Sequence, residues 1–382
     1  MSVETRVETA PETTRGRRPQ GTTKRGTTPG TQAPSADAPT RTTVELVAEG
    51  RRLRGRRRRL VIAVLALVVI AGFACSVMLG DRVYGPVEVW RVMIGEEVDG
   101  ATFTVGSLRL PRATLAVATG LCFGLAGVTF QTMLRNPLAS PDIIGISTGA
   151  SAAAAIAIVM FGLGGAAVSG VAVVSGLVVA IVIYLLAFRR GGVGTRLILI
   201  GIGIAAMLES VIAYVLSQAG QWDLQEVTRW LTGSLNGVGW AQVASTAIAL
   251  VVLGPLLLAC TRSLSALQLG DDTAAALGVR VEVTRLFIVV AAVGLVAFAT
   301  AAAGPIAFVA FLAGPIAARL VGPNGSLLVP AALVGAALVV IADFVGQHLL
   351  DTRFPVGVVT GVLGAPYLVY LIVRTNRAGG SL

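Results

Sequence analysis

Few side chains in this sequence could carry enzyme-like chemistry. The 382-residue chain has one lysine, Lys24, and one histidine, His348. A phosphate-binding P-loop needs a lysine between a glycine and a Ser or Thr, because that lysine reaches the terminal phosphates; Lys24 instead follows Thr23. The sequence has no His-Glu-x-x-His motif, no Cys-x-x-Cys motif and no constellation that a single histidine could serve. We therefore predict no catalytic residue and no cofactor on this chain. If its activity consumes energy, that energy must come from a partner chain or an ion gradient.

Three cysteines and two acidic residues lie inside long apolar runs. Cys75, Cys122 and Cys260 are predicted to be small packing residues rather than metal ligands or disulfides. Glu209 and Asp343 need an explanation because a charge inside a bilayer is costly. Glu209 could line a pathway, take part in proton coupling, or be protonated and packed. Asp343 is predicted to cap or pair within a helical bundle.

A segment from 267 to 280 has the features of a short helix lying outside a bilayer. Gly270 and Gly278 bracket a run of good helix formers. Asp271 and Asp272 suit its first turn, where acids cap free amides and meet the positive end of the dipole, and Gly278 suits its end. We predict a docking site for a cytoplasmic partner, with an ordinary interfacial turn as the alternative. The residues assigned to it are Leu269, Gly270, Asp271, Asp272, Ala275, Leu277, Gly278 and Arg280.

Composition indicates the elements that must position these residues. The chain is 55% hydrophobic and only 13% charged, whereas soluble domains have about 25% charged residues. Segments of membrane-spanning length follow one another at 60–79, 108–134, 143–164, 166–188, 196–217, 241–260, 286–303, 305–321, 327–349 and 356–373. The fold class predicted is an all-α integral membrane protein with ten transmembrane helices per subunit.

The basic excess of the chain is confined to its N-terminal part. Residues 1–59 hold fourteen basic and six acidic side chains, so +8 of the net charge of +10 lies there. That location excludes a nucleic-acid-binding face on the folded body. We predict a disordered basic cytoplasmic tail at 1–59, a ten-helix domain at 60–374 and a short cytoplasmic tail at 375–382. The RRLRGRRRR run at 51–59 precedes a span without a convincing cleavage site, so it is interpreted as a retained anchor that contacts anionic membrane lipid rather than as a signal peptide.

Arginine positions predict the orientation of the chain in a cell membrane. Arginines gather in alternate connections, which places both termini in the cytoplasm. These arginines are Arg135, Arg189, Arg190, Arg196, Arg262, Arg280, Arg285, Arg319, Arg374 and Arg377. The opposite connections, at 80–105 and 222–240, are acidic or mixed and carry aromatic residues. Aromatic residues there are typical interface anchors, and docking of an external partner is the alternative.

Several ordered motifs carry a resemblance to a known family. They are LRLPR at 108–112, Gly127 with Gln131, NPLASP at 136–141, GISTGA at 145–150, WLTGS at 230–234, the loop at 269–278, GPIAFV at 304–309, Ala342-Asp343, and the segment 354–366. Together these motifs resemble the FecCD family of ABC-transporter permeases, from residue 60 to 374. The resemblance implies pathway or structural roles for Gln131, Asn136, Pro137, Pro141 and Gly145, and the position of Glu209 inside a span adds it as a candidate for the pathway. It implies external docking at Trp230, Gly233 and Ser234, to which we add the acids Glu96 and Glu97.

The resemblance also implies an assembly. It predicts the type II ABC importer permease fold, a second permease subunit that is identical or homologous, and two ATPase subunits that carry ATP and Mg and dock at the 270–278 loop. It also predicts an external substrate-binding lipoprotein. The glycines Gly120, Gly124 and Gly127 are interpreted as close-packing positions on the second span.

The predicted cargo is a ferric siderophore carried by alternating access. Many family members have Pro-His where this chain has Gly314 and Pro315, which leans away from the vitamin B12 type. The chain also has few Met, Cys or His residues to bind a bare metal. Haem or cobalamin is the alternative cargo. A proton- or sodium-coupled secondary transporter, with Glu209 and Asp343 as coupling sites, is the alternative from a different class.

Overall fold

The computed structural model describes residues 43–142, 144–187, 193–322 and 325–377. Lys24, Arg189 and Arg190 lie outside these ranges, as do residues 1–42 of the predicted tail 1–59 and residues 378–382 of the predicted tail 375–382. The chain divides into two units, Met1–Glu49 and Gly50–Leu382. The architecture below is that of the second unit.

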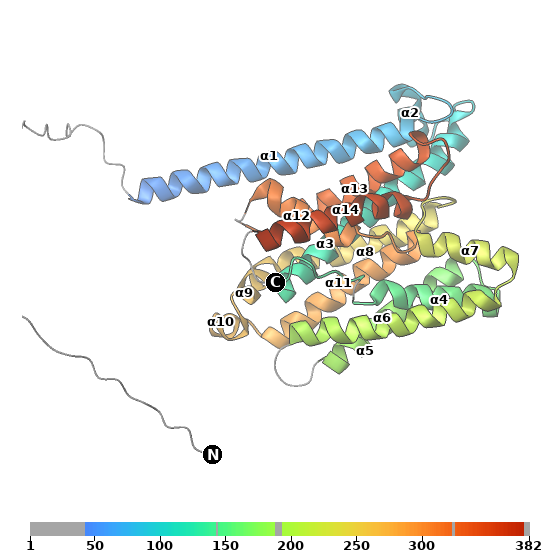
Figure 1. Ribbon diagram of the computed structural model, residues 1–382. Coiled ribbons are helices and arrows are strands. Elements are labelled where there is room, and N and C mark those ends of the chain that lie inside the picture. Colours follow the sequence, from blue (N-terminus) through green and yellow to red (C-terminus); the bar gives the residue numbers. More distant parts are fainter. Residues whose placement is uncertain (1–42, 143, 188–192, 323–324, 378–382) are drawn as a thin grey trace, which may run out of the picture. The chain divides into compact units, whose positions relative to one another are not determined.

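The elements of the described ranges are helical (Figure 1). In chain order they are α1 (Thr43–Met78), α2 (Pro86–Met93), the π-helix η1 (Thr102–Arg109), α3 (Leu110–Leu134), α4 (Ile146–Phe161), α5 (Ala166–Ala187), α6 (Val193–Gln218), α7 (Gln221–Thr232), α8 (Trp240–Ala259), α9 (Thr261–Leu267), α10 (Asp271–Ala276), α11 (Val281–Ala303), α12 (Val309–Val321), α13 (Leu328–His348) and α14 (Val356–Arg377).

The ten predicted spans are confirmed. Seven helices of the described residues are long and apolar enough to cross a membrane, and three shorter apolar helices lie in α4, α12 and α14. The first helix begins earlier than predicted, at Thr43 rather than residue 60. Residues 43–59 are therefore helical, which corrects that part of the predicted disordered tail. Arginine, leucine and glutamate are good helix formers, and extending an existing helix avoids the cost of nucleating a new one.

Three helix boundaries differ from the predicted spans for local reasons. The second span begins in η1, which runs directly into α3. The connection after α3 stays non-helical until Ile146, because Pro137 and Pro141 cannot donate backbone hydrogen bonds. The eighth span begins at Val309 rather than at residue 305, so Gly304 to Phe308 form a break between α11 and α12.

Helix α3 lies at the centre of the bundle and packs against α13, α11, α12 and α8. Glycines on α3 allow the neighbouring helices to approach it closely. A Cβ at Gly120 would lie 2.6 Å from the carbonyl oxygen of Gly335 on α13, and one at Gly127 would overlap the carbonyl oxygen of Ala310 on α12. Gly124 contacts α13 in the same way. The predicted close-packing role of these three glycines is confirmed.

Successive spans run in alternating directions, so the connections gather at two ends of the bundle (Figure 1). We call the end that carries α9 and α10 the α10 end, and the end that carries α2 and α7 the α7 end. The connection between α3 and α4 lies at the α10 end, and the connection between α13 and α14 lies at the α7 end.

Candidate functional site

The α10 end carries the predicted docking loop. Helix α10 follows directly after Gly270, whose φ is 109°, and Gly278 just beyond it has a φ of 84°. Both values lie in the region that favours glycine, so the predicted short helix is confirmed. Leu269 and Leu277 flank α10, and each is 64% exposed. These two leucines, on either side of a short helix outside the spans, present an apolar surface that the described residues leave uncovered.

Helix α10 is fastened to the bundle by the Asp271 carboxylate in addition to the buried Ala274. Arg285 on α11 donates hydrogen bonds from Nη2 to both Asp271 oxygens at 2.9 and 3.0 Å. Arg135, at the end of α3, lies 3.7 Å from the same carboxylate. The Arg285 side chain is only 9% exposed, so Asp271 supplies the charge that this buried guanidinium needs. Asp271 therefore acts through ion pairs. The side chains of Asp272, Ala275 and Arg280 are exposed.

Gln131 links α3 to α12. Its Nε2 donates to the Phe311 carbonyl oxygen at 2.9 Å, and the side chain is buried. A Cβ at Gly314 would collide with Gln131 Oε1. Gly314 and Pro315 are the two positions where the resemblance leads us to expect Pro-His. The departure is therefore matched by a buried glutamine across the helix interface.

The connection between α3 and α4 gathers the other predicted motif residues. Asn136 Oδ1 accepts a hydrogen bond from the Leu138 amide at 2.8 Å, Pro137 is exposed, and Pro141 is buried. Gly145 has a φ of 88°, and a Cβ there would lie 3.2 Å from the Gly201 carbonyl oxygen of α6. These residues share one connection, and Gly145 is the one among them that the structure shows against α6.

Sequence reasoning missed Asp142 in this connection. Ser147 Oγ donates to Asp142 Oδ1 at 2.6 Å, and Ser140 Oγ lies 3.4 Å from Oδ2. Burial raises the pKa of the Asp142 carboxyl, and the two serine hydrogen bonds oppose that shift. A carboxylate flanked by two serines in an otherwise apolar stretch was the available signal.

Glu209 lies apart from this cluster. It is on α6, one turn beyond Ala205, and its side chain is exposed. Little of the apolar stretch of α6 is buried within the chain. Within the described residues, the Glu209 side chain is therefore not packed against the other helices of its own subunit. A carboxylate on such a face needs water or another protein beside it, because lipid offers it no partner.

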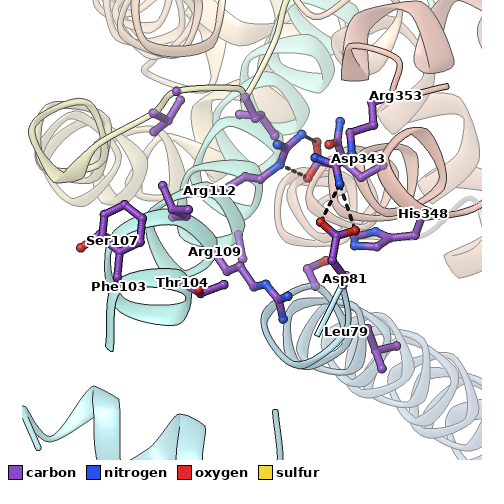
Figure 2. A pocket seen from close by; sticks show the side chains of 18 of the residues that line it. Leu79, Asp81, Phe103, Thr104, Ser107, Arg109, Arg112, Asp343, His348 and Arg353 are labelled. Carbon is purple, nitrogen blue, oxygen red and sulfur yellow. Dashed lines mark hydrogen bonds and ion pairs between the residues drawn. The ribbon is translucent and has the colours of Figure 1, made fainter. Parts of the chain in front are cut away.

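The α7 end holds an open pocket of about 560 Å³ (Figure 2). Arg112 on α3 donates two hydrogen bonds to the buried Asp343 on α13, at 2.6 and 2.8 Å, and a third to Asn236 at 2.6 Å. Arg353 pairs with Asp81 at 2.9 Å. The predicted pairing role of Asp343 is confirmed, and its partner is the second arginine of the LRLPR motif.

The first arginine of that motif caps the C-terminus of α1. Arg109 donates from Nη1 to the carbonyl oxygens of Val77 and Met78, and from Nη2 to that of Arg82. These are the kinds of carbonyl groups that a helix leaves unpaired at its C-terminus. His348, which also lines the pocket, is exposed and stacks on Phe344.

The residues predicted for external docking divide into two sets. Glu96 and Glu97 are exposed after α2, and Glu96 forms an ion pair with Arg91. Trp230 is half-buried against the bundle, and Gly233 is buried. The exposed aromatic residue of α7 is Trp222, which is 83% exposed.

Gly233 and Ser234 fasten α7 to the spans. The Ser234 amide donates to the Ala303 carbonyl oxygen at 2.7 Å, and the Gly357 amide donates to that of Gly233 at 3.1 Å. A Cβ at Gly233 would lie 2.5 Å from the Pro305 carbonyl oxygen. These two residues therefore join α7 to the α11–α12 break and to α14.

Comparisons with known proteins agree with this architecture. The FecCD transport family matches residues 67–374. The chain is 39% identical to the ferric enterobactin transport system permease protein FepG of Escherichia coli (strain K12), over 84% of this chain and 98% of that protein. It is 32% identical to FepD, another ferric enterobactin transport system permease protein of that strain, over 84% of this chain and 97% of that protein.

A solved structure has the same fold. It is described as an inward-facing conformation of a putative metal-chelate type ABC transporter, and it is superimposed with a TM-score of 0.74 at 25% identity, over 83% of this chain and 99% of that one. Its fold supports the predicted type II importer permease. The chain therefore belongs to the FecCD transport family and is a membrane permease subunit of an ABC importer.

Proposed function

We propose that this chain passes a ferric siderophore across the cell membrane by alternating access. The observation that carries the proposal is its similarity to two ferric enterobactin permeases over nearly their whole lengths. The family membership sets aside the ion-coupled secondary transporter. Asp343, one of the two acids on which that alternative rested, is bound to Arg112.

The α9–α10 segment is the proposed docking site for an ATPase subunit. Its support is the exposure of Leu269 and Leu277 beside a helix that an ion pair fastens to the bundle. A displacement of α10 would be transmitted to α11 through the Asp271–Arg285 ion pair, and to the end of α3 through Arg135. The α3–α4 connection, with Asn136 and Gly145, begins directly after Arg135. This arrangement can transmit ATPase movement to the spans.

The exposed face of α6 is the proposed contact with a second permease chain. Glu209 is the observation in support, because a carboxylate in a span requires water or protein at its side. A pathway between two permeases would supply both. The similarity to FepG and to FepD favours a homologous chain as the partner over an identical one.

The α7 end is the proposed contact with an external substrate-binding lipoprotein. A second pocket, of about 520 Å³, lies there beside α7. Trp222, Glu226, Arg229 and Asn236 line it, so it offers both charges and an aromatic surface to a polar partner. Glu96 and Glu97 add exposed negative charge after α2.

An uptake assay tests the proposed cargo. A strain that lacks this chain should lose accumulation of one ⁵⁵Fe-loaded siderophore and regain it when the chain is returned. Haem and cobalamin uptake, measured in the same cells, are the controls. If haem or cobalamin uptake is lost while ferric-siderophore uptake stays normal, that compound is the cargo instead of a ferric siderophore. Normal uptake of all three classes would refute the proposal.

A further inference from the structure

The basic segment of α1 divides into two groups of arginines. Arg57 donates from Nε to the Leu320 carbonyl oxygen at 3.2 Å, and Arg58 donates from Nη2 to that of Ser326 at 2.9 Å. These two side chains hold the end of α12 and the start of α13. The other five are exposed: Arg51, Arg52, Arg54, Arg56 and Arg59.

The five exposed arginines surround much of the helix. At 3.6 residues per turn they project over about 200° of its circumference. Because α1 runs without a break from this segment into its apolar part, the arginines form a partial collar around the helix where the apolar part begins. A collar is expected on a helix that enters the bilayer directly.

The rest of α1 fixes the depth of this collar. The apolar part that follows is almost uncovered by the described residues of this chain, since Leu60, Leu67 and Ile70 are each more than 60% exposed, and it carries no charged residue that would need water or protein beside it. With a rise of 1.5 Å per residue, residues 51–59 extend about 12 Å from the apolar part. The headgroup layer of one leaflet is about 5–8 Å thick. The arginines thus stand in that layer or within about 10 Å of it, the range over which charges act in salt.

We propose that Arg51, Arg52, Arg54, Arg56 and Arg59 form a binding collar for anionic phospholipid headgroups. Guanidinium groups match phosphate oxygens in charge and in hydrogen-bonding geometry. The collar is continuous with Arg57 and Arg58, so bound lipid also steadies the helix that holds the α12–α13 connection. That connection and α9 line a common cavity of about 120 Å³, which includes Ser265 and Ser326.

Lipid titration of the purified full-length chain tests the collar. Phosphatidylglycerol is added in a neutral detergent, and bound lipid is measured by native mass spectrometry. Phosphatidylcholine with the same acyl chains is the comparison lipid. Changing all five arginines to glutamine, a residue of similar helix propensity, should weaken phosphatidylglycerol binding by at least about tenfold and leave phosphatidylcholine binding unchanged.

Two control variants separate the collar from general charge and from folding. Arg262→Gln/Arg280→Gln removes two exposed arginines from α9 and the α10–α11 connection and should leave binding unchanged. Arg57→Gln/Arg58→Gln should lower thermal stability while retaining the lipid. Equal binding of both lipids by the native chain, or unchanged phosphatidylglycerol binding by the five-residue variant, would overturn the proposal. If that variant does not fold, native-chain binding that is insensitive to salt between 50 and 500 mM NaCl overturns it instead, since roughly tenfold more salt shortens electrostatic range about threefold.

Discussion

At the scale of single residues, the α10 end depends on a few polar side chains set into an apolar bundle. Asp142 is held by Ser147, Gln131 by the Phe311 carbonyl, and Arg285 by Asp271. A buried polar group that loses its partner costs about 1–3 kcal/mol. Each of these positions is therefore one at which a single substitution should have a measurable effect.

The Asp142 carboxyl predicts a pH-dependent stability. Burial holds its folded-state pKa above the unfolded value, so the folded chain binds this proton more tightly. The free energy of unfolding then falls as pH rises from about 4 through the raised pKa, and the loss persists above it. Asp142→Asn removes the charge but keeps an oxygen for the Ser147 hydroxyl. At pH 8 Asp142→Asn should therefore unfold at a higher temperature than the native chain, because the amide carries no charge to bury.

Thermal unfolding of the purified chain at pH 5 and pH 8 measures this effect. The advantage of Asp142→Asn should shrink at pH 5, where the native carboxyl is closer to protonation. Asp272→Asn is the control, because Asp272 is exposed and should give the same melting temperature as the native chain at each pH. A destabilised Asp142→Asn at both pH values would contradict the prediction.

Gly314→Ala tests the contact between α3 and α12. The added methyl group must displace Gln131, which then loses the Phe311 carbonyl. We expect a loss of about 1–3 kcal/mol of stability, typical of overpacking. Gly314→Ala/Gln131→Ala should recover part of it, since the obstructing amide is gone. The matched control is Gly170→Ala on α5, where no atom lies within 4 Å of the new Cβ. Equal losses in the Gly170 and Gly314 variants would show that helix position, not this contact, sets the cost.

At the scale of elements, α10 is fixed on one side and open on the other. Its fixed side is the Asp271–Arg285 pair, and its open side includes Leu269 and Leu277. If these leucines enter a groove of an ATPase subunit, replacing each with serine should cost about tenfold or more in affinity. Leu269→Ser/Leu277→Ser should abolish co-purification of the ATPase without changing the melting temperature of the isolated chain. Leu53→Ser, an equally exposed leucine on α1, should retain the ATPase. Retention by both variants would refute docking at α10.

The α6 face makes a prediction about water. If Glu209 lines a pathway between two permeases, a cysteine there should react with a membrane-impermeant maleimide in the assembled transporter. The labelled chain would lack Cys75, Cys122 and Cys260. Ile248→Cys on α8 is the control, because Ile248 is an exposed apolar residue that should face lipid and stay unlabelled. Equal protection of both cysteines would mean that Glu209 does not contact the pathway.

Local signals predicted some elements and could not predict others. The two glycines around α10 are caps, which depend on neighbouring residues, so the short helix was predictable from sequence. The Gln131–Gly314 contact joins α3 to α12, and nothing local to either residue points to the other. The exposure of Glu209 was unpredictable for a different reason. Lipid-facing and core-facing helix surfaces are equally apolar, so hydropathy finds a span without telling which of its faces another helix covers.

At the scale of the whole molecule, the remaining question is which end of the bundle faces the cytoplasm. Arginines at the α10 end include Arg135, Arg262, Arg280 and Arg319 in addition to the collar on α1. The arginines described at the α7 end are fewer: Arg82, Arg91, Arg109, Arg112, Arg229 and Arg353. The positive-inside rule counts such residues across the membrane, and the excess favours a cytoplasmic α10 end.

Cysteine labelling in intact cells decides this orientation. In a chain without its native cysteines, Trp222→Cys on α7 should react with an impermeant maleimide added to cells whose cytoplasmic membrane is intact. Asp272→Cys on α10 should react only after that membrane is permeabilised. Both side chains are exposed in the native chain, so a difference in labelling reports the side of the membrane rather than burial. The opposite pattern would invert the molecule. It would place the proposed ATPase site outside the cell, where no ATP is available. The assignment of α10 as the coupling element would then be wrong.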